Sequence, residues 1–171
     1  MNDCKIRPAK PHDFQRILAL NLAAIKATSE MDLPHLQNLH AWSDYHKVVI
    51  HQDQVVAFLL VLSAGQAYQS PNYRWFNQHF PSFYYVDRIV VDAAMTGKKI
   101  GSLLYQDLFT TAKTVGIELI ACEYNIKPLN TASQIFHQRF GFTEVATQWL
   151  DEHSKQVSLQ VAEVSKYKEG S

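Results

Sequence analysis

The chain has 171 residues, of which 47% are hydrophobic and 19% are charged, a balance typical of a globular protein and not of a disordered one. Lys and Arg together number 16, as do Asp and Glu, so the formal net charge is zero. No overall basic field therefore indicates nucleic acid or an anionic membrane as a partner. The length predicts a single domain over residues 1–171 that can bury a full core.

Neither targeting nor metal-binding signals stand out. The longest apolar run, residues 55–62, is too short to span a bilayer, and no secretory leader opens the sequence. Cys4 and Cys122 follow no disulfide or metal-binding pattern, and the eight histidines do not have the spacing of metal ligands. We therefore expect a cytoplasmic protein with reduced cysteines and without a bound metal.

The first part of the chain predicts a strand and two helices. Residues 4–8 form a short strand. Pro11 then opens a helix in which apolar residues recur at helical spacing as far as Ile25. A weaker helical segment follows over about residues 33–45.

A hairpin and a long connection come next. Residues 48–50 and 55–63 predict the hairpin, and its second strand is continuously apolar, which places that strand centrally in a sheet. Residues 65–81 are expected to form a long connection that contains several aromatic side chains.

A strand that leads directly into a helix organises the middle of the sequence. Aromatic and β-branched residues dominate residues 83–91, as in a strand that is buried on both faces. Gly97 and Gly101 interrupt the pattern, and from Ile100 to Val115 apolar residues recur at helical spacing. The first amides of such a helix have no partner within the helix, so they and the helix dipole favour an anion such as phosphate.

The last part of the chain predicts a strand, a helix and a hairpin. Residues 117–125 form a second buried strand, and the helix that follows ends at Gly141, a residue suited to the C′ position. Residues 143–150 and 156–164 form the closing hairpin. This order of elements alone indicates an α/β or α+β sheet with helices on its faces.

Two stretches resemble the motifs of the GNAT superfamily, the N-acetyltransferases that bind acetyl-CoA. Motif A reads Arg or Gln, two residues, Gly, one residue, and Gly or Ala. Gly101 keeps the last of these positions, whereas Thr96 replaces the Arg or Gln and Lys99 replaces the first Gly. The loop does not have the spacing of a Walker A loop. Taken alone, it is also compatible with an ordinary glycine turn between a strand and an amphipathic helix.

Motif B of the superfamily reads Asn, two residues, Ala or Ser, two residues, Leu or Phe, Tyr, two residues, an apolar residue and Gly-Phe. The residues that match it in register are Asn130, Ser133, Phe136, Phe140, Gly141 and Phe142. His137 stands where many GNAT members carry a tyrosine thought to protonate the leaving CoA thiolate. Further stretches from about Val55 onward resemble an uncharacterised bacterial subfamily of predicted acetyltransferases, a match that brings no substrate with it.

The resemblance implies a fold and a cofactor. The GNAT fold has a mixed, mostly antiparallel sheet of about seven strands, with helices on both faces and a splayed pair of central strands that holds the pantetheine arm. The implied cofactor is acetyl-CoA (coenzyme A), and the implied partner is an amine. Since GNAT domains often dimerise, a homodimer is also an expectation.

The resemblance assigns the binding of acetyl-CoA to three segments. The backbone after the first half of the central strand pairs with the pantetheine amides, the glycine loop holds the diphosphate, and the start of the motif B helix contacts the arm from the other side. These residues are Ile89, Val90, Val91, Gly97, Lys98, Lys99, Ile100, Gly101, Ser102, Asn130 and Ser133.

The candidate catalytic residues are Asp87, Glu123 and His137. A carboxylate in a partly buried cleft has its pKa raised toward neutrality, so Asp87 or Glu123 suits a general base. His137 is expected to replace the tyrosine acid. The alternatives are a salt bridge from Asp87 to Arg88 or Arg74, a capping role for Glu123, and a merely polar His137.

The candidate acceptor site is the aromatic segment of the long connection. Arg74 among aromatic side chains suits the recognition of a carboxylate or phosphate, but an aromatic cluster that packs the loop down is equally compatible with the sequence. The residues expected to bind the acceptor are Asn72, Tyr73, Arg74, Trp75, Tyr85 and Asn125, of which Asn125 alternatively caps a strand end.

We therefore predict an acetyl-CoA-dependent N-acetyltransferase that moves the acetyl group directly to a primary amine of a small molecule. A covalent intermediate is not expected, since Cys122 lies in an apolar strand where burial keeps a thiol inert. Two alternatives remain. The altered motif A and the missing tyrosine favour a non-catalytic acyl-CoA-binding sensor or assembly module, and a protein or peptide N-terminal acetyltransferase would differ in its acceptor groove.

Overall fold

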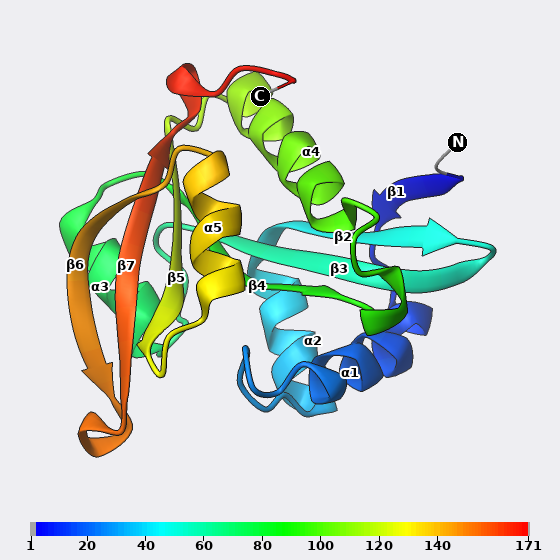
Figure 1. The fold of residues 1–171 in the computed structure, drawn as a ribbon, viewed down its shortest axis with the longest axis horizontal. Helices are drawn as coiled ribbons and strands as arrows, with labels where there is room; N and C mark the ends of the chain where they lie inside the picture. The colour runs from blue at the N-terminus through cyan, green and yellow to red at the C-terminus, as the bar shows by residue number, and fades with distance from the viewer. Residues whose placement is uncertain (1–2, 171) are drawn as a thin grey trace. The chain divides into compact units, whose positions relative to one another are not determined.

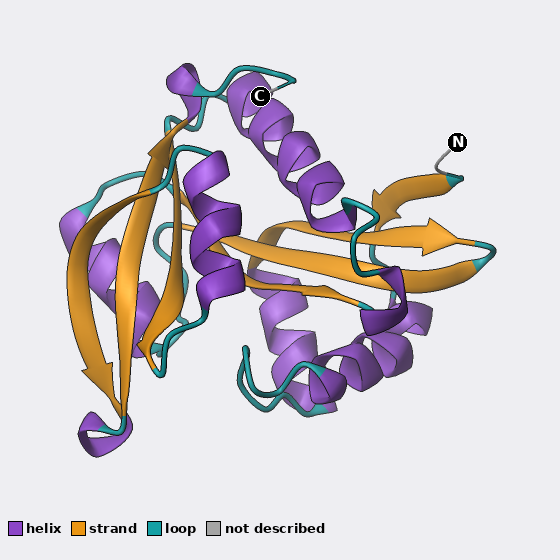
Figure 2. Ribbon diagram, in the orientation of Figure 1, coloured by secondary structure: helices purple, strands orange, loops and turns teal. Residues whose placement is uncertain are grey.

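A computed structural model describes residues 3–170 (Figures 1 and 2). Its strands are β1 (Cys4–Pro8), β2 (Ser43–His51), β3 (Gln54–Ser63), β4 (Tyr84–Val91), β5 (Leu119–Lys127), β6 (Thr143–Leu150) and β7 (Lys155–Glu163). Its α-helices are α1 (Phe14–Ala23), α2 (Leu33–Trp42), α3 (Pro71–His79), α4 (Ile100–Val115) and α5 (Thr131–Arg139). The mixed composition of helix and strand confirms the predicted α/β class.

The strands form one sheet in the order β1-β2-β3-β4-β5-β7-β6. The pairs β1–β2, β2–β3, β5–β7 and β6–β7 are antiparallel, whereas β4 and β5 are parallel. The β4–β5 register covers Tyr84–Ile120 and Tyr85–Ala121, at the beginning of both strands.

The described residues fall into two compact units. The first comprises residues 3–62 and 87–108, and Figure 1 shows α1 and α2 on one side of β2 and β3 and the beginning of α4 on the other. β3 is buried without interruption from Val55 to Leu62, as its continuous apolar sequence predicts. Ile17, Leu36 and Phe58 are fully buried and form part of this core.

The second unit comprises residues 63–86 and 109–170, and Figure 1 shows α5 and α3 on opposite sides of β5 and β7. An aromatic cluster of Tyr73, Phe76, Phe83 and Tyr85 lies in it, with ring centroids 5.4 to 6.2 Å apart. All four rings are almost completely buried. Aromatic pairs at this separation stabilise a core beyond the area that they bury.

Two sequence predictions of secondary structure are wrong. The helix expected to reach about residue 45 ends at Trp42, because Ser43 is already paired with Leu62 in the sheet and its hydroxyl donates to the carbonyl of His40 at 2.7 Å. The connection expected over residues 65–81 contains α3, which begins with Pro71 in the first turn.

Candidate active site

The turn that joins β4 to α4 is fixed at its entry by Asp92. The carboxylate of Asp92 accepts a hydrogen bond from the amide of Ala94 at 3.0 Å and forms an ion pair with Arg16 at 2.5 Å. The bond from the Ala94 amide and the charge of Arg16 hold the pKa of Asp92 below its ordinary value. The end of β4 is therefore anchored by a charged group directly before the predicted diphosphate loop.

The predicted diphosphate loop has two residues in the left-handed region. Gly97 has a φ of 81° and Lys99 a φ of 58°. Glycine adopts such a φ without steric cost, whereas a residue with a Cβ does so rarely. Lys99 stands where motif A carries Gly, so in this chain a residue with a Cβ adopts a conformation that glycine adopts without cost.

The first turn of α4 presents donors that suit a diphosphate. The first helical hydrogen bond runs from Leu103 N to Lys99 O at 3.0 Å, so the amides of Ile100, Gly101 and Ser102 precede the helical ladder. Lys99 cannot cap them, because a lysine side chain has no acceptor. Three such amides, the positive end of a 16-residue helix and the exposed side chains of Lys98 and Lys99 form a donor set that fits a phosphorylated cofactor.

The second half of β4 offers its main chain. Ile89 and Val91 are partly exposed, while Val90 between them is buried. Asp87 is likewise half-buried as a residue, yet its side chain is only 3% exposed, so its main chain carries most of the exposure. An accessible strand edge of this kind can pair with the amides of a pantetheine arm.

Asp87 is tied to Arg88 within the first unit. Its Oδ2 accepts from Arg88 Nε at 2.7 Å, and both side chains are 3% exposed. This is the salt bridge that the sequence offered as the alternative to a general base. The catalytic role of Asp87 stays a prediction, and any such role has to operate from within a buried ion pair.

In the second unit, the hydroxyl of Tyr85 donates to Glu123 Oε1 at 2.8 Å. The Tyr85 ring belongs to the aromatic cluster and is 1% exposed, so it holds the carboxylate from a fixed position. The neighbouring Cys122 is buried, and burial raises the pKa of its thiol, with the charge of Glu123 adding to the effect. The thiol is therefore protonated and inert, in line with transfer without a covalent intermediate.

His137 lies in the last turn of α5 and is 4% exposed. Its Nδ1–H donates to the carbonyl of Ser133 at 2.7 Å, and its ring stacks on Tyr124 with centroids 5.7 Å apart. Burial lowers the pKa of His137 to about 4, although the bond to Ser133 opposes the shift. At neutral pH the imidazole is uncharged, with its Nδ1 proton committed to the helix backbone.

The family assignment agrees with this arrangement. The model of the acetyltransferase (GNAT) family matches residues 12–142. The chain belongs to the GNAT acetyltransferase family. It is accordingly an acyltransferase of a family that transfers acetyl groups from acetyl-CoA, and the two motifs found in the sequence mark that membership. No curated protein sequence matches the chain.

Solved GNAT structures share the fold. Ard1 from Thermoplasma volcanium has 15% identity and a TM-score of 0.75, with 94% of this chain and 97% of that one covered. An N-acetyltransferase from Staphylococcus aureus Mu50 has 22% identity and a TM-score of 0.69, with 95% and 99% covered. Naa50 from Arabidopsis thaliana, in complex with the bisubstrate analogue CoA-Ac-MVNAL, has 13% identity and a TM-score of 0.72, with 93% and 97% covered.

A side chain caps the beginning of α5, the segment predicted to contact the CoA arm in this GNAT chain. Asn130 Oδ1 accepts from the amide of Ser133 at 3.1 Å, which is an N-cap of the ordinary kind. Ser133 Oγ also lies 3.1 Å from Nδ1 of His137. Asn130 and Ser133 therefore shape the helix end, and their contact with the cofactor stays a prediction.

The predicted acceptor residues of the GNAT chain lie on α3, at the beginning of β4 and on β5, all in the second unit. Tyr73 donates to the carbonyl of Ser63 at 2.7 Å within the aromatic cluster, and buried Asn72 accepts from Gln148 at 3.1 Å. Arg74 is exposed, and Trp75 stacks on His79 with centroids 3.9 Å apart. Half-buried Asn125 accepts from the amide of Asn130 through its carbonyl at 3.0 Å. The contacts of Tyr73 are the packing role that the sequence left open.

Sequence reasoning offered Asp87 as a partner of Arg88 but missed two others, Asn21 and Ser29. Arg88 Nη1 donates to Asn21 Oδ1 at 3.0 Å and to the carbonyl of Ser29 at 3.1 Å. Only one signal pointed to this network, namely a pair of charged residues, Asp87 and Arg88, in the middle of a strand that is otherwise aromatic and apolar. Neither Asn21 nor Ser29 carries a motif.

Among residues 3–170, no three His, Cys, Asp or Glu side chains are grouped as ligands for a metal ion. In the described part of the chain, no helix has both the length and the apolarity needed to cross a bilayer.

Proposed function

We propose that this GNAT enzyme moves an acetyl group directly from acetyl-CoA to the primary amine of a small molecule. The first turn of α4 carries the proposal, because the amides of Ile100, Gly101 and Ser102 precede the helical ladder and stand beside two lysines. When bound, acetyl-CoA supplies an acetyl thioester that an amine can attack. The accessible main chain of Ile89 and Val91 would pair with its pantetheine arm and orient the thioester carbonyl.

Glu123 is the better placed of the two candidate bases. Its carboxylate accepts a hydrogen bond from the hydroxyl of Tyr85, whereas the carboxylate of Asp87 is committed to an ion pair with the buried Arg88. A carboxylate that is held by a hydroxyl can still accept the proton of an attacking amine. We assign Glu123 the role of base and Asp87 that of a partner for Arg88.

His137 contributes as a neutral imidazole. With a pKa of about 4, only a small fraction of it is protonated at neutral pH, so it is a poor source of the proton that the leaving thiolate needs. Since Nδ1–H is bonded to Ser133, the lone pair of a neutral ring lies on Nε2. We propose that the ring orients groups near the thioester and adds modestly to the rate.

A small acceptor is supported by a pocket in the first unit. Residues of α1, of the following turn and of α2 line a volume of about 470 Å³, within the range of small-molecule sites. A cytoplasmic location stays part of the proposal and rests on Cys4 and Cys122, two free thiols of the kind found in reducing compartments.

Release of free CoA thiol from acetyl-CoA in the presence of an amine panel tests the proposal. The panel contains aliphatic amines, amino acids and short peptides with free N-termini, and mass spectrometry identifies the acetylated product. We expect thiol release and an acetylated small amine. A protein that binds CoA but releases no thiol with any amine of the panel would be a sensor. Turnover of the peptides alone would make it a peptide N-terminal acetyltransferase.

A further inference from the structure

The aromatic cluster of the second unit reaches the carboxylate of Glu123. Tyr85 is paired with Ala121 in the parallel register of β4 and β5, and Glu123 follows Ala121 by two residues along β5. Residues two apart in a strand share a face of the sheet and lie about 7 Å apart. The hydroxyl of Tyr85 spans this step and donates to Glu123 Oε1 at 2.8 Å. The cluster therefore holds the carboxylate that we assign as the base.

Helix α3 fixes the ring of Tyr85. This ring meets that of Tyr73 edge to face, with centroids 5.4 Å apart and an interplanar angle of 67°, and lies 5.8 Å from that of Phe76. Tyr73 and Phe76 are fully buried, and Tyr85 is 1% exposed. A ring that is packed on several sides has little room to change its rotamer. The direction of the Tyr85 hydroxyl is therefore set by α3.

Tyr73 is itself anchored at its hydroxyl. It donates to the carbonyl of Ser63 at 2.7 Å and accepts from the amide of Gln66 at 2.9 Å. The turn that carries Gln66 is tied to α3 a second time, because the amide of Gly65 donates to Asn77 Oδ1 at 2.8 Å. The end of β3, helix α3 and the beginning of β4 thus form one packed and hydrogen-bonded support.

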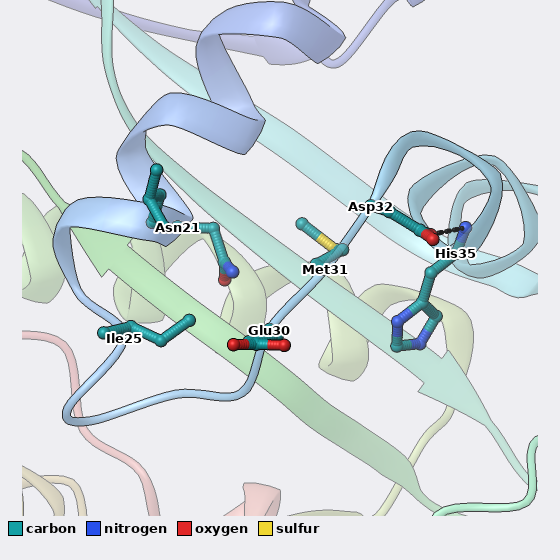
Figure 3. A pocket seen from close by; sticks show the side chains of 7 residues that line it. Asn21, Ile25, Glu30, Met31, Asp32 and His35 are labelled. Atoms are coloured by element: carbon teal, nitrogen blue, oxygen red, sulfur yellow. Dashed lines mark hydrogen bonds between the residues drawn. The ribbon is translucent and has the colours of Figure 1, made fainter.

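This support is separate in sequence from the other candidate binding segments. None of its residues belongs to motif A or motif B. None of them lines the pocket of the first unit, whose lining in Figure 3 comes from α1, α2 and the turn between them. With almost no exposed surface, Tyr73 and Tyr85 can influence the reaction only through the groups that they contact.

We propose that Tyr85 is a positioning residue for the base Glu123, and that Tyr73 acts on the base through Tyr85. This inference rests on the proposed function. The hydroxyl of Tyr85 fixes the direction in which the carboxylate points. A hydrogen bond donated to a carboxylate also stabilises the charged form, so the pKa of Glu123 is lower with the bond than without it. Glu123 is thereby ready to take a proton from the amine at a lower pH.

The pH dependence of kcat/KM for the amine tests the role of Tyr85. Tyr85→Phe keeps the ring in the cluster and removes the hydroxyl. The acid limb of the profile should move up by about one pH unit, the effect of a charged hydrogen bond. Well above that limb the rate should return to within about threefold of the parent rate, and the KM for acetyl-CoA should stay within about twofold.

Tyr84→Phe is the matched control, because Tyr84 is a buried neighbour on the same strand that points to the opposite face. It should leave the acid limb in place. An acid limb that stays in place in Tyr85→Phe would overturn the inference. A loss of rate that is equal at every pH would indicate a merely structural hydroxyl and would also overturn it.

A double-mutant cycle tests the role of Tyr73. Tyr73→Phe removes the anchors to Ser63 and Gln66 and should lower kcat/KM for the amine at pH 7 by about threefold. Because Tyr73 acts through Tyr85, the same change should have no further effect in the Tyr85→Phe background. Equal losses in both backgrounds would overturn the role of Tyr73.

Carbon NMR of the Glu123 side-chain carboxyl reads the bond without turnover. In the CoA-bound protein the pKa of this carboxyl should be about one unit lower in the parent than in Tyr85→Phe. If Tyr85→Phe does not fold, 3-fluorotyrosine at position 85, a stronger donor, should lower the pKa of Glu123 instead. An unchanged pKa in an active transferase would overturn this inference alone. A parent protein that binds CoA and acetylates no amine would overturn the proposed function and this inference with it.

Discussion

Helices α4 and α5 both follow a strand of the sheet, but their first turns are built differently. α5 is preceded by the N-cap residue Asn130, whose side chain accepts from the amide of Ser133 and whose carbonyl accepts from the amide of Gln134. α4 is preceded by Lys99, which has no side-chain acceptor and has a left-handed φ of 58°. The chain therefore closes one helix start with its own side chain and leaves the other to an external anion.

The presence or absence of a side-chain cap distinguishes a helix start with a structural role from one that binds a ligand. A capped turn gains about 1 kcal/mol from its side chain and loses a donor for ligands. An uncapped turn forgoes that stabilisation, and at Lys99 it also bears the cost of a left-handed lysine. We interpret these two local costs as the signature of the diphosphate site.

The largest expected effect comes from placing the same charge in both turns. Gly101→Asp should weaken CoA binding by about 100-fold or more, because it brings bulk and a negative charge where phosphate has to approach the amides. Ala132→Asp, at the equivalent position of α5, should change the affinity by no more than about threefold. Calorimetric titration of CoA measures both. Equal losses of CoA affinity in the two variants would contradict the assignment of the diphosphate site to the first turn of α4.

The comparison extends to the two carboxylates, Asp87 in the first unit and Glu123 in the second. Glu123→Gln should lower kcat/KM by roughly 100-fold, as for a positioned general base, with the affinity for CoA unchanged. Asp87→Asn should instead destabilise the fold by about 3 kcal/mol, since it leaves Arg88 buried without its ion pair. Steady-state kinetics and denaturant unfolding separate the two outcomes. The reverse pattern would reassign the base to Asp87.

His137 in α5 should affect the rate less and the pH dependence of stability more. We expect His137→Phe to lower kcat by about tenfold, with little change in the KM for acetyl-CoA. A rate equal to that of the parent from pH 6 to 9 would remove the residue from the mechanism.

The sign of the pH effect follows from the lowered pKa. The unfolded chain binds a proton near pH 6.5 and folded His137 only near pH 4, so stability is full above 6.5 and falls as the pH drops to 4. The loss is about 3 kcal/mol for this residue. His137→Phe should remove that part of the slope in unfolding curves at several pH values. Burial and the neighbouring His40 lower the pKa of His46 to about 3. His46 should therefore keep its contribution to the pH dependence of stability in both the parent and the His137→Phe variant.

The smallest effect concerns the lysine that replaces the glycine of motif A. Lys99→Gly should raise the free energy of unfolding by about 1 kcal/mol, because glycine adopts a φ of 58° without strain. The same change should weaken CoA binding by about two- to fivefold through the lost charge, and less so at high salt. Thermal unfolding and calorimetry measure the two effects. A variant of lower stability would show that Lys99 is held by contacts other than its backbone.

Much of the fold was predictable, because periodicity and motifs report local structure. The apolar run of β3 and the strand-to-helix junction at β4 and α4 follow directly from residue spacing. α3 was missed because only two of its residues besides Asn72 are buried, namely Tyr73 and Phe76, too few to mark a period. The end of α2 was missed because strand pairing at Ser43 overrides the helical pattern.

The candidate site was predictable only where a motif names it. Motif A located the loop, but the left-handed lysine and the cap by Asn130 depend on backbone geometry that residue types alone do not specify. The hydrogen bond from Arg88 to Asn21 joins residues that are 67 positions apart in the chain, so no local pattern predicts it. Long-range hydrogen bonds between single polar residues leave no period in a sequence.

The amide resonances of the two helix starts test the central claim most directly. CoA is added to labelled protein, and the shifts of Ile100, Gly101 and Ser102 are compared with those of residues 131–133. The account predicts that the α4 amides move most, as expected for groups that donate to a diphosphate. CoA that binds while these three amides stay in place would contradict it.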